Sequence, residues 1–505
     1  GWDWARNGKD IDFTKPVKNG PDINGFDQYY GHCGSLDMPP YVWVDTGRVT
    51  AGPDREEGVT KQEDPYGWYR KGPIGSDFHI AEVLPHLFDK TIERVKERAA
   101  AAKSGKPFFI YLPLPAPHTP IVPVPPFKGA SKMNPYADFV MQVDHHMGQL
   151  LAALKQAGLD QDTLVIFTSD NGCSPEANFE LLKKHGHNPS ARYRGHKADI
   201  YEGGHRVPFV ARWPGHIKGG RTTTALACLT DVYSTLAEIT GQPRKPLGGE
   251  DGFSLLPVFR GRRSSGRDSL ISHSIGGSFA IRQGVWKLCL SAGSGGWSAP
   301  REKEAQQQGL PKLQLFNLAT DPGERKNLAA AQPAKVNALL TLLDGQVRNG
   351  RCTPGENVAN DRDVKFLPAG VTLPVPPAAG YSIGLSMYSL RQMFFDGSLH
   401  ALDYPAFAKT TFGITKIDVW DGGFPKDRKT DPAFYRELRQ RADQAGSEIF
   451  LLMAGPIDAR GGSADERREQ APKFHVAVDN AVVLGARFVR IFLKAPDGIR
   501  ETAIS

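Results

Sequence analysis

The sequence lacks several features that would place a chain of 505 residues in a specialised class. No apolar run approaches the roughly 18 residues expected of a membrane-spanning helix. The five cysteines are scattered and form no Cys-x-x-Cys pair, so neither a zinc site nor a disulfide framework is indicated. Lysine and arginine are not clustered with aromatic residues, which makes nucleic acid an unexpected partner.

The composition that remains is that of an ordinary globular protein, with 40% hydrophobic and 23% charged residues. The length predicts two to four domains. The formal net charge of +7 favours anionic ligands, and sulfated or acidic glycans fit it.

Residues 1–265 alternate strand-like and helical patterns, which predicts an α/β domain. Residues 106–112 and 163–168 have the composition of strands, and the second of these is expected to be a buried parallel strand. Residues 136–157 carry apolar side chains at helical spacing.

The rest of the chain divides into three further parts. Residues 266–350 hold short strands between glycine-rich turns and end in a helix, which predicts a small antiparallel subdomain. Residues 351–378 are polar and then proline-rich, as is typical of a linker. Residues 379–505 contain four β/α steps, about half of what a closed (β/α)₈ barrel needs.

The most informative stretch ends the strand at 163–168 with Asp170, Asn171 and Gly172. Ligands of open α/β sheets gather beyond the carboxyl ends of strands. A carboxylate and an amide oxygen at that point suit a hard cation such as Ca²⁺ or Mg²⁺. Ordinary turn chemistry explains the same three residues, so both interpretations stay open at this point.

Two other groups of residues have the composition of a site. His118 follows the strand-like segment 106–112 and stands among prolines, although a lone loop histidine is usually without function. The segment 194–208 combines glycines with Arg194, Lys197 and Glu202, and such charge clusters are often only solvated surface.

Taken together and in order, these groups resemble the sulfatase family, the arylsulfatase-like branch of the alkaline phosphatase superfamily. The resemblance extends from residue 1 to about residue 350. The matching pieces are Ala116-Pro117-His118-Thr119-Pro120, Phe167-Thr168-Ser169-Asp170-Asn171-Gly172, Arg194-Gly195-His196-Lys197, Tyr201-Glu202-Gly203-Gly204-His205-Arg206-Val207-Pro208, Arg212-Trp213-Pro214-Gly215 and Leu315-Phe316-Asn317-Leu318.

The resemblance implies an alkaline-phosphatase-like fold, with a mostly parallel sheet between helices, and hydrolysis of sulfate esters on a small molecule or glycan. It assigns Asp170 and Asn171 as ligands of Ca²⁺, with Mg²⁺ less suited, and His118 and Lys197 as catalytic contacts to the sulfate group. Substrate-binding positions are expected among Asp37, Glu202, His205 and Arg206. It also implies a periplasmic or secreted protein.

One departure from the family pattern concerns the nucleophile, a formylglycine made from Cys or Ser in a Cys-x-Pro-x-Arg element. Cys173-Ser174-Pro175 and Cys352-Thr353-Pro354 begin like that element, but both lack its arginine and follow the metal-ligand motif. We reject both as nucleophiles. We therefore expect an N-terminally truncated sequence whose nucleophile lies in the missing segment and which by itself is inactive.

Residues 379–505 resemble the first half of a xylose-isomerase-like sugar isomerase or epimerase barrel, with Asp418 and Asp421 at the end of one strand. We interpret these two acids as turn caps rather than metal ligands. Three alternatives to sulfate-ester hydrolysis follow from the sequence: a phosphodiesterase or phosphonate hydrolase of the same superfamily, a sugar isomerase or epimerase, and a non-catalytic protein that binds sulfated glycans.

Overall fold

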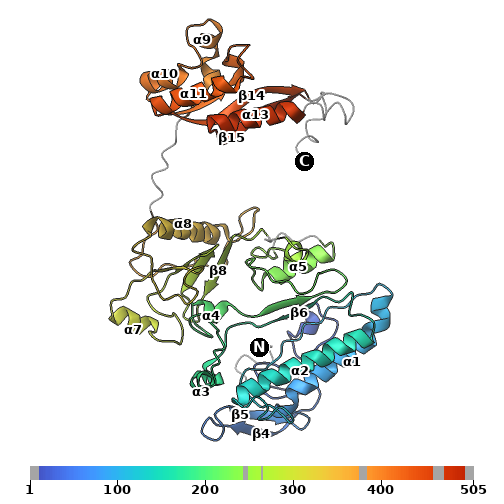
Figure 1. The fold of residues 1–505 in the computed structure, drawn as a ribbon. Helices are drawn as coiled ribbons and strands as arrows, with labels where there is room; N and C mark the ends of the chain where they lie inside the picture. The colour runs from blue at the N-terminus through green and yellow to red at the C-terminus, as the bar shows by residue number, and fades with distance from the viewer. Residues whose placement is uncertain (1–10, 243–247, 263–265, 375–383, 459–470, 495–505) are drawn as a thin grey trace. The chain divides into compact units, whose positions relative to one another are not determined.

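The computed structural model describes residues 11–242, 248–262, 266–374, 384–458 and 471–494. The chain divides into two compact units, Gly1–Pro374 and Val375–Ser505 (Figure 1). None of the helices in these ranges is long and apolar enough to cross a membrane.

The first unit contains short strands and helices in irregular alternation. Its helices are α1 (Val83–Lys103), α2 (Pro135–Gln156), α3 (Phe179–Lys184), α4 (Glu202–His205), α5 (Asp231–Ile239), α6 (Leu256–Phe259), α7 (Glu302–Gln307) and α8 (Pro333–Asn349). Its strands are β1 (Tyr30–Gly31), β2 (Val44–Asp45), β3 (Arg48–Val49), β4 (Pro53–Val59), β5 (Tyr69–Gly75), β6 (Val165–Thr168), β7 (Phe209–Arg212), β8 (Ser269–His273), β9 (Phe279–Gln283), β10 (Trp286–Cys289) and β11 (Gln314–Asn317).

Helices α1 and α2 pack against each other, and both come before β6 in the sequence (Figure 1). Helix α2 confirms the helix expected at 136–157. It begins where the Asn134 side chain accepts a hydrogen bond from the Ala137 N–H (3.0 Å), with Pro135 at the first helical position. Phe139 and Val143 on α2 share a buried cluster with Phe88 of α1, and each such side chain contributes about 1.5–3 kcal/mol on burial.

Strand β6 confirms the strand expected at 163–168, but the expected burial and parallel pairing are wrong, because its side chains are half-buried or exposed. It pairs with β7 in an antiparallel register in which Val165 faces Arg212. Residues 106–112 form no strand, and they pair with no other segment in the described part of the chain. A strand requires a partner backbone for its N–H and C=O groups, which these residues do not meet, and Phe109 and Tyr111 stay 60% and 69% exposed.

The antiparallel subdomain expected at 266–350 is present. Its sheet has the order β11-β10-β9-β8, and every neighbouring pair is antiparallel. Helix α8 covers one face, where Leu339 and Leu343 pack on Ile281 and Leu288. These four side chains are fully buried, so the subdomain has a core of its own.

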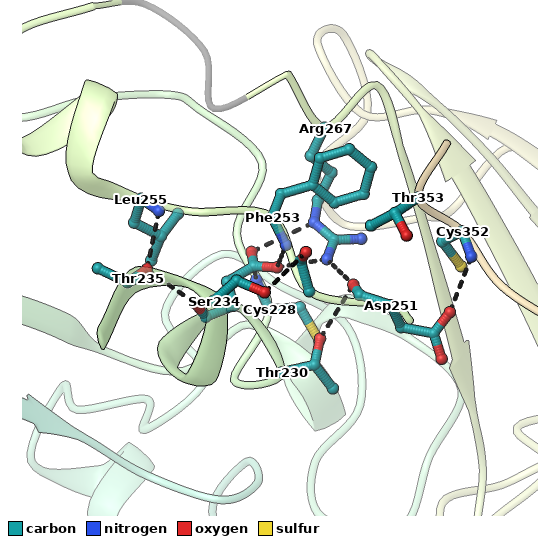
Figure 2. A network of polar contacts seen from close by, with 12 residues as sticks. Cys228, Thr230, Ser234, Thr235, Asp251, Phe253, Leu255, Arg267, Cys352 and Thr353 are labelled. Atoms are coloured by element: carbon teal, nitrogen blue, oxygen red, sulfur yellow. Dashed lines mark hydrogen bonds and ion pairs between the residues drawn. The ribbon is translucent and has the colours of Figure 1, made fainter. Parts of the chain in front are cut away.

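Residues 351–374 belong to the first unit and are not a free linker as expected. The Cys352 N–H donates to Asp251 (2.9 Å), and the Thr353 hydroxyl donates to the Glu250 carbonyl (2.6 Å), as Figure 2 shows for Cys352. The polar network in Figure 2 continues to Arg267, which makes a buried ion pair with Asp231. Residues 375–378, the rest of the expected linker, lie outside the described residues.

The second unit is a parallel sheet with the order β12-β13-β14-β15 and covering helices. Its strands are β12 (Gly384–Leu385), β13 (Lys416–Trp420), β14 (Glu448–Asp458) and β15 (Phe488–Lys494), and its helices are α9 (Arg391–Phe395), α10 (Tyr404–Phe412), α11 (Pro432–Ala445) and α13 (Ala471–Leu484). The alternation expected at 379–505 is therefore present within 384–494, and its likeness to half a barrel stays a prediction.

The two acids noted in the sequence of this unit connect distant segments, with Asp418 inside β13 and Asp421 directly after it. The Asp418 carboxylate accepts the Met387 N–H (2.8 Å), and the Asp421 carboxylate accepts the Gly455 N–H (2.7 Å). Burial raises the pKa of both side chains. Because these partners lie 31 and 34 positions away in the sequence, the contacts join separate segments of the unit and are not local turn caps, so the interpretation of both acids as turn caps is wrong.

Candidate active site

The turn after β6 presents oxygen atoms to solvent. The Ser169 hydroxyl donates to the Asn171 carbonyl (3.0 Å), and the Asn171 side-chain amide donates to Asp170 Oδ1 (2.9 Å). Asp170 is exposed and Asn171 is half-buried. The turn interpretation and the metal interpretation are therefore compatible, because these bonds leave Asp170 Oδ2 and Asn171 Oδ1 available as hard oxygen donors.

Glycine lets a second backbone segment lie directly against this turn. The Gly172 N–H donates to the Gly204 carbonyl (2.9 Å), and a Cβ on Gly172 would lie 1.9 Å from the carbonyl oxygen of Gly203. A Cβ on Gly203 would in turn lie 2.2 Å from the Gly195 carbonyl oxygen. No side chain fits between these backbones, so glycine is required for their close approach.

Lys197 is joined to the same turn through its backbone. Its N–H donates to the Cys173 carbonyl (2.9 Å), and its side chain is half-buried. The fully buried Asp199 holds this loop, because its carboxylate accepts the His196 N–H (3.0 Å) and the Trp297 N–H (2.8 Å). Asp170, Asn171 and Lys197 are therefore held on adjoining loops.

Glu202 lies in a buried charge cluster that we call the Lys287 cluster, formed by Glu202, Arg282, Lys287 and Glu324. Lys287 Nζ lies 3.1 Å from Glu202 and 3.0 Å from Glu324, and Arg282 lies 3.0 Å from Glu202. The Glu202 N–H also donates to Glu324 (2.7 Å). The cluster therefore joins α4 to the antiparallel subdomain.

Opposite charges within the Lys287 cluster offset the free-energy cost of burying each of them. Burial by itself raises the pKa of Glu202, but Lys287 and Arg282 outweigh it and hold that pKa below its usual value. Burial raises the pKa of Glu324 despite the same lysine. The described contacts of Glu202 are structural, and its role in substrate binding stays a prediction.

His205 and Arg206 end the helix α4. Burial and the nearby Lys287 charge lower the pKa of His205 to about 4, and its Nε2 has no hydrogen-bond partner among the described residues. Arg206 is exposed, lies 3.5 Å from Glu202 and stacks over the Tyr193 ring (4.6 Å). Arg206 is thus the solvent-facing member of this pair.

Two of the predicted site residues are not joined to this group by any contact between described residues. The half-buried His118 bonds the Thr119 carbonyl through Nδ1 (2.8 Å), which leaves Nε2 available. Asp37 is buried, and its carboxylate pairs with Arg70 (2.6 Å) in a different part of the unit. The roles of both residues stay predictions.

The two rejected cysteines have environments that suppress thiolate formation. Burial raises the pKa of Cys173, and burial together with Asp251 raises the pKa of Cys352 to about 12. A thiolate is the reactive form of cysteine, so neither thiol is activated.

Sequence reasoning missed the residues that position the site. Lys287 stands between apolar neighbours in the strand Trp286-Lys287-Leu288-Cys289. A lysine in such a strand could have indicated a buried charge with a partner. Asp199 and Glu324 gave no comparable signal, because their partners are distant in sequence.

Comparisons with known proteins agree with this geometry. Residues 24–242 match the family model described as Sulfatase. Residues 24–242 of this chain are therefore a sulfatase-family segment.

Relatives with assigned names support this membership. The N-acetylgalactosamine-6-O-sulfatase of Bacteroides thetaiotaomicron is 27% identical over 66% of this chain and 70% of that protein. Human arylsulfatase A is 36% identical over 49% of this chain and 51% of that protein. A solved structure from work on glycosaminoglycan metabolism by Bacteroides thetaiotaomicron has a TM-score of 0.57 and 26% identity, and the match covers 66% of this chain and 75% of that one. The sulfatase match confirms the α/β, alkaline-phosphatase-like fold class.

The close approach of backbones in this sulfatase-family site predicts that Gly172→Ala destabilises the first unit. Gly172 has no positive φ, so the effect is steric: the new methyl group must displace the Gly203 carbonyl. We expect a loss of about 1–3 kcal/mol in the free energy of unfolding, measured by urea titration. Gly148→Ala is the control, because a Cβ at that exposed position on α2 meets nothing within 4 Å. Equal stability of the two variants would contradict the prediction.

The environment of His205 predicts a dependence of stability on pH. The folded protein keeps His205 neutral down to about pH 4, whereas an unfolded histidine gains a proton near pH 6.5. The free energy of unfolding therefore falls as pH falls below 6.5, by about 2 kcal/mol from this residue at pH 5. In His205→Gln the decrease from pH 7 to pH 5 should be smaller by that amount. In His216→Gln, whose side chain is 48% exposed, the decrease should be unchanged.

Proposed function

We propose that this chain forms part of a site that hydrolyses sulfate esters, with Lys197 and His118 in contact with the sulfate group. The observation that supports the proposal most is the hydrogen bond from the Lys197 N–H to Cys173 (2.9 Å), which joins the lysine loop to the Asp170-Asn171 turn. Cleavage of a sulfate ester places negative charge on the departing oxygen. A cationic side chain stabilises that charge, and His118 in its protonated form would carry a proton on Nε2 that it could donate to the departing oxygen.

Asp170 and Asn171 fit a Ca²⁺ ion in their chemistry but supply only part of a coordination shell. Calcium takes six to eight oxygen ligands and tolerates irregular geometry, whereas Mg²⁺ requires a near-ideal octahedron. No group of three or more His, Cys, Asp or Glu side chains suited to a metal occurs among the described residues. A bound Ca²⁺ would supply positive charge beside the sulfate group, and these two residues would hold it weakly.

The proposed nucleophile is a formylglycine that the printed sequence does not contain, since no cysteine stands in a Cys-x-Pro-x-Arg element. The chain by itself is therefore expected to bind a sulfated small molecule or glycan without hydrolysing it. We also propose a periplasmic or secreted location, which the family resemblance implies.

Removal of the carboxylate at Asp170 should weaken calcium binding. We expect the chain to bind Ca²⁺ with a dissociation constant of about 1 mM, as in weak extracellular sites, and Asp170→Ala to weaken it at least about tenfold. Isothermal titration calorimetry measures both constants. Asp144→Ala removes an exposed carboxylate on α2 and should leave the affinity unchanged. Equal calcium affinity in Asp170→Ala and the parent chain would argue against the assignment.

Removal of the charge at Lys197 should weaken binding of an aryl sulfate. The lysine is a compact cation on a flexible stem, and its loss should lower the affinity for phenyl sulfate by about tenfold. Lys183→Ala, at an exposed position on α3, is the matched control. Titration with phenyl phosphate tests the phosphodiesterase alternative, because stronger binding of that probe than of phenyl sulfate would favour it over the sulfatase assignment.

A further inference from the structure

A pocket lined by arginine side chains adjoins the loop that carries Lys197. Its cavity has a volume of about 300 Å³ and is lined by Asn188, Ala191, Arg192, Tyr193, Arg194, Gly323 and Arg325. One wall comes from the loop after α3, and the other comes from the turn after β11. The two walls approach each other at Gly323, where a Cβ would be in van der Waals contact with the Arg192 carbonyl oxygen at 3.4 Å.

Three guanidinium groups and no carboxylate line this pocket. Arg194 is fixed, since it donates to the Glu324 carbonyl (2.9 Å) and stacks over Tyr201 (3.9 Å). Arg192 and Arg325 are exposed, and neither forms an ion pair with any residue in the described ranges.

The acidic residues beside the pocket form no ion pair with its arginine side chains in the described part of the chain. The Glu324 carboxylate is fully buried and paired with Lys287 (3.0 Å). The Asp321 carboxylate accepts the backbone N–H groups of Arg325 (2.8 Å) and Lys326 (2.9 Å). The positive charge at the pocket mouth is therefore not neutralised by a neighbouring side-chain ion pair. A concave surface lined by one sign of charge concentrates the field and attracts counter-ions.

We propose that this pocket binds a second sulfate group of the substrate, so that the chain selects multiply sulfated oligosaccharides. The inference rests on the proposed function, and it names the substrate class of the same site. Arginine suits the role because its planar fork can bind a sulfate oxygen pair in a bidentate manner, which lysine cannot do. The Tyr193 ring lies beneath the guanidinium of Arg192 (5.7 Å) and of Arg206 (4.6 Å), which orders both cations.

The pocket and the proposed hydrolytic site are close along one loop. Arg192 and Lys197 are five residues apart, which is at most about 18 Å of extended chain. The Ser190 hydroxyl donates to the Gly195 carbonyl (2.9 Å) and shortens this loop further. A saccharide whose first sulfate contacts Lys197 therefore can reach the pocket with the sulfate of a neighbouring sugar.

The test compares two disaccharides, one with a sulfate on each sugar and one with a single sulfate. Isothermal titration calorimetry of the whole chain should show tighter binding of the disulfated probe. In the double variant Arg192→Ala/Arg325→Ala, affinity for the disulfated probe should fall about tenfold, whereas affinity for the monosulfated probe stays unchanged. Arg192→Lys/Arg325→Lys should recover only part of the loss, because it restores the charge without the fork.

The matched control is Arg48→Ala/Arg362→Ala, which removes the same charge from exposed positions of the first unit and should change neither affinity. Equal binding of the two probes by the parent chain would overturn the proposal, and so would an equal decrease for both probes in the pocket variant. Lys197→Ala separates this failure from failure of the proposed function, since it should weaken both probes. If Lys197→Ala weakens neither, the hydrolytic site itself is misassigned.

Discussion

The close approach of three backbone segments, at Gly172, Gly195 and Gly203, is the constraint on which the site depends. The Gly203 carbonyl oxygen lies 1.9 Å from where a Cβ on Gly172 would stand, and the Gly195 carbonyl oxygen lies 2.2 Å from where a Cβ on Gly203 would stand. Interiors are packed too densely to absorb a methyl group there without displacing backbone. The turn with Asp170 and the loop with Lys197 both continue directly from this contact. Backbone packing therefore places the side chains of Asp170 and Lys197 on adjoining loops. Hydrogen bonds from Gly172 to Gly204 and from Lys197 to Cys173 complete the contact.

The Lys287 cluster attaches this packed backbone to the antiparallel subdomain. Burying a charge is costly unless it is paired, and a lysine between Glu202 and Glu324 satisfies both carboxylates at about 3 Å. Removing any one partner would leave an uncompensated buried charge. The cluster therefore fixes the position of α4 relative to the sheet β8–β11. The subdomain is part of the site's support, and through the turn after β11 it also contributes a wall of the arginine pocket.

Local sequence patterns predicted much of the fold. The helix at 136–157 and the short strands within 266–350 were predictable because periodicity and turn residues act over a few positions. The pairing of strands was harder to predict from the sequence. Residues 106–112 have a strand composition but no partner strand in the described chain. Strand β6 pairs antiparallel with β7. The composition of a strand does not determine which strand it pairs with or in which direction. Residues 351–374 lack periodicity yet pack on the first unit through specific contacts to residues 250 and 251.

The sequence by itself determined the chemistry available to this protein: the oxygen donors Asp170 and Asn171, the cation Lys197, the order of the sulfatase motifs, and the absence of a Cys-x-Pro-x-Arg element. Tertiary structure alone decided which of these residues meet. It joined the turn at 170–172 to the loop at 194–199, buried Glu202 against a lysine 85 residues away, and gathered Arg192 and Arg325 around one pocket. The physical reason is that contacts between distant segments depend on how backbones pack in three dimensions, which no local pattern records.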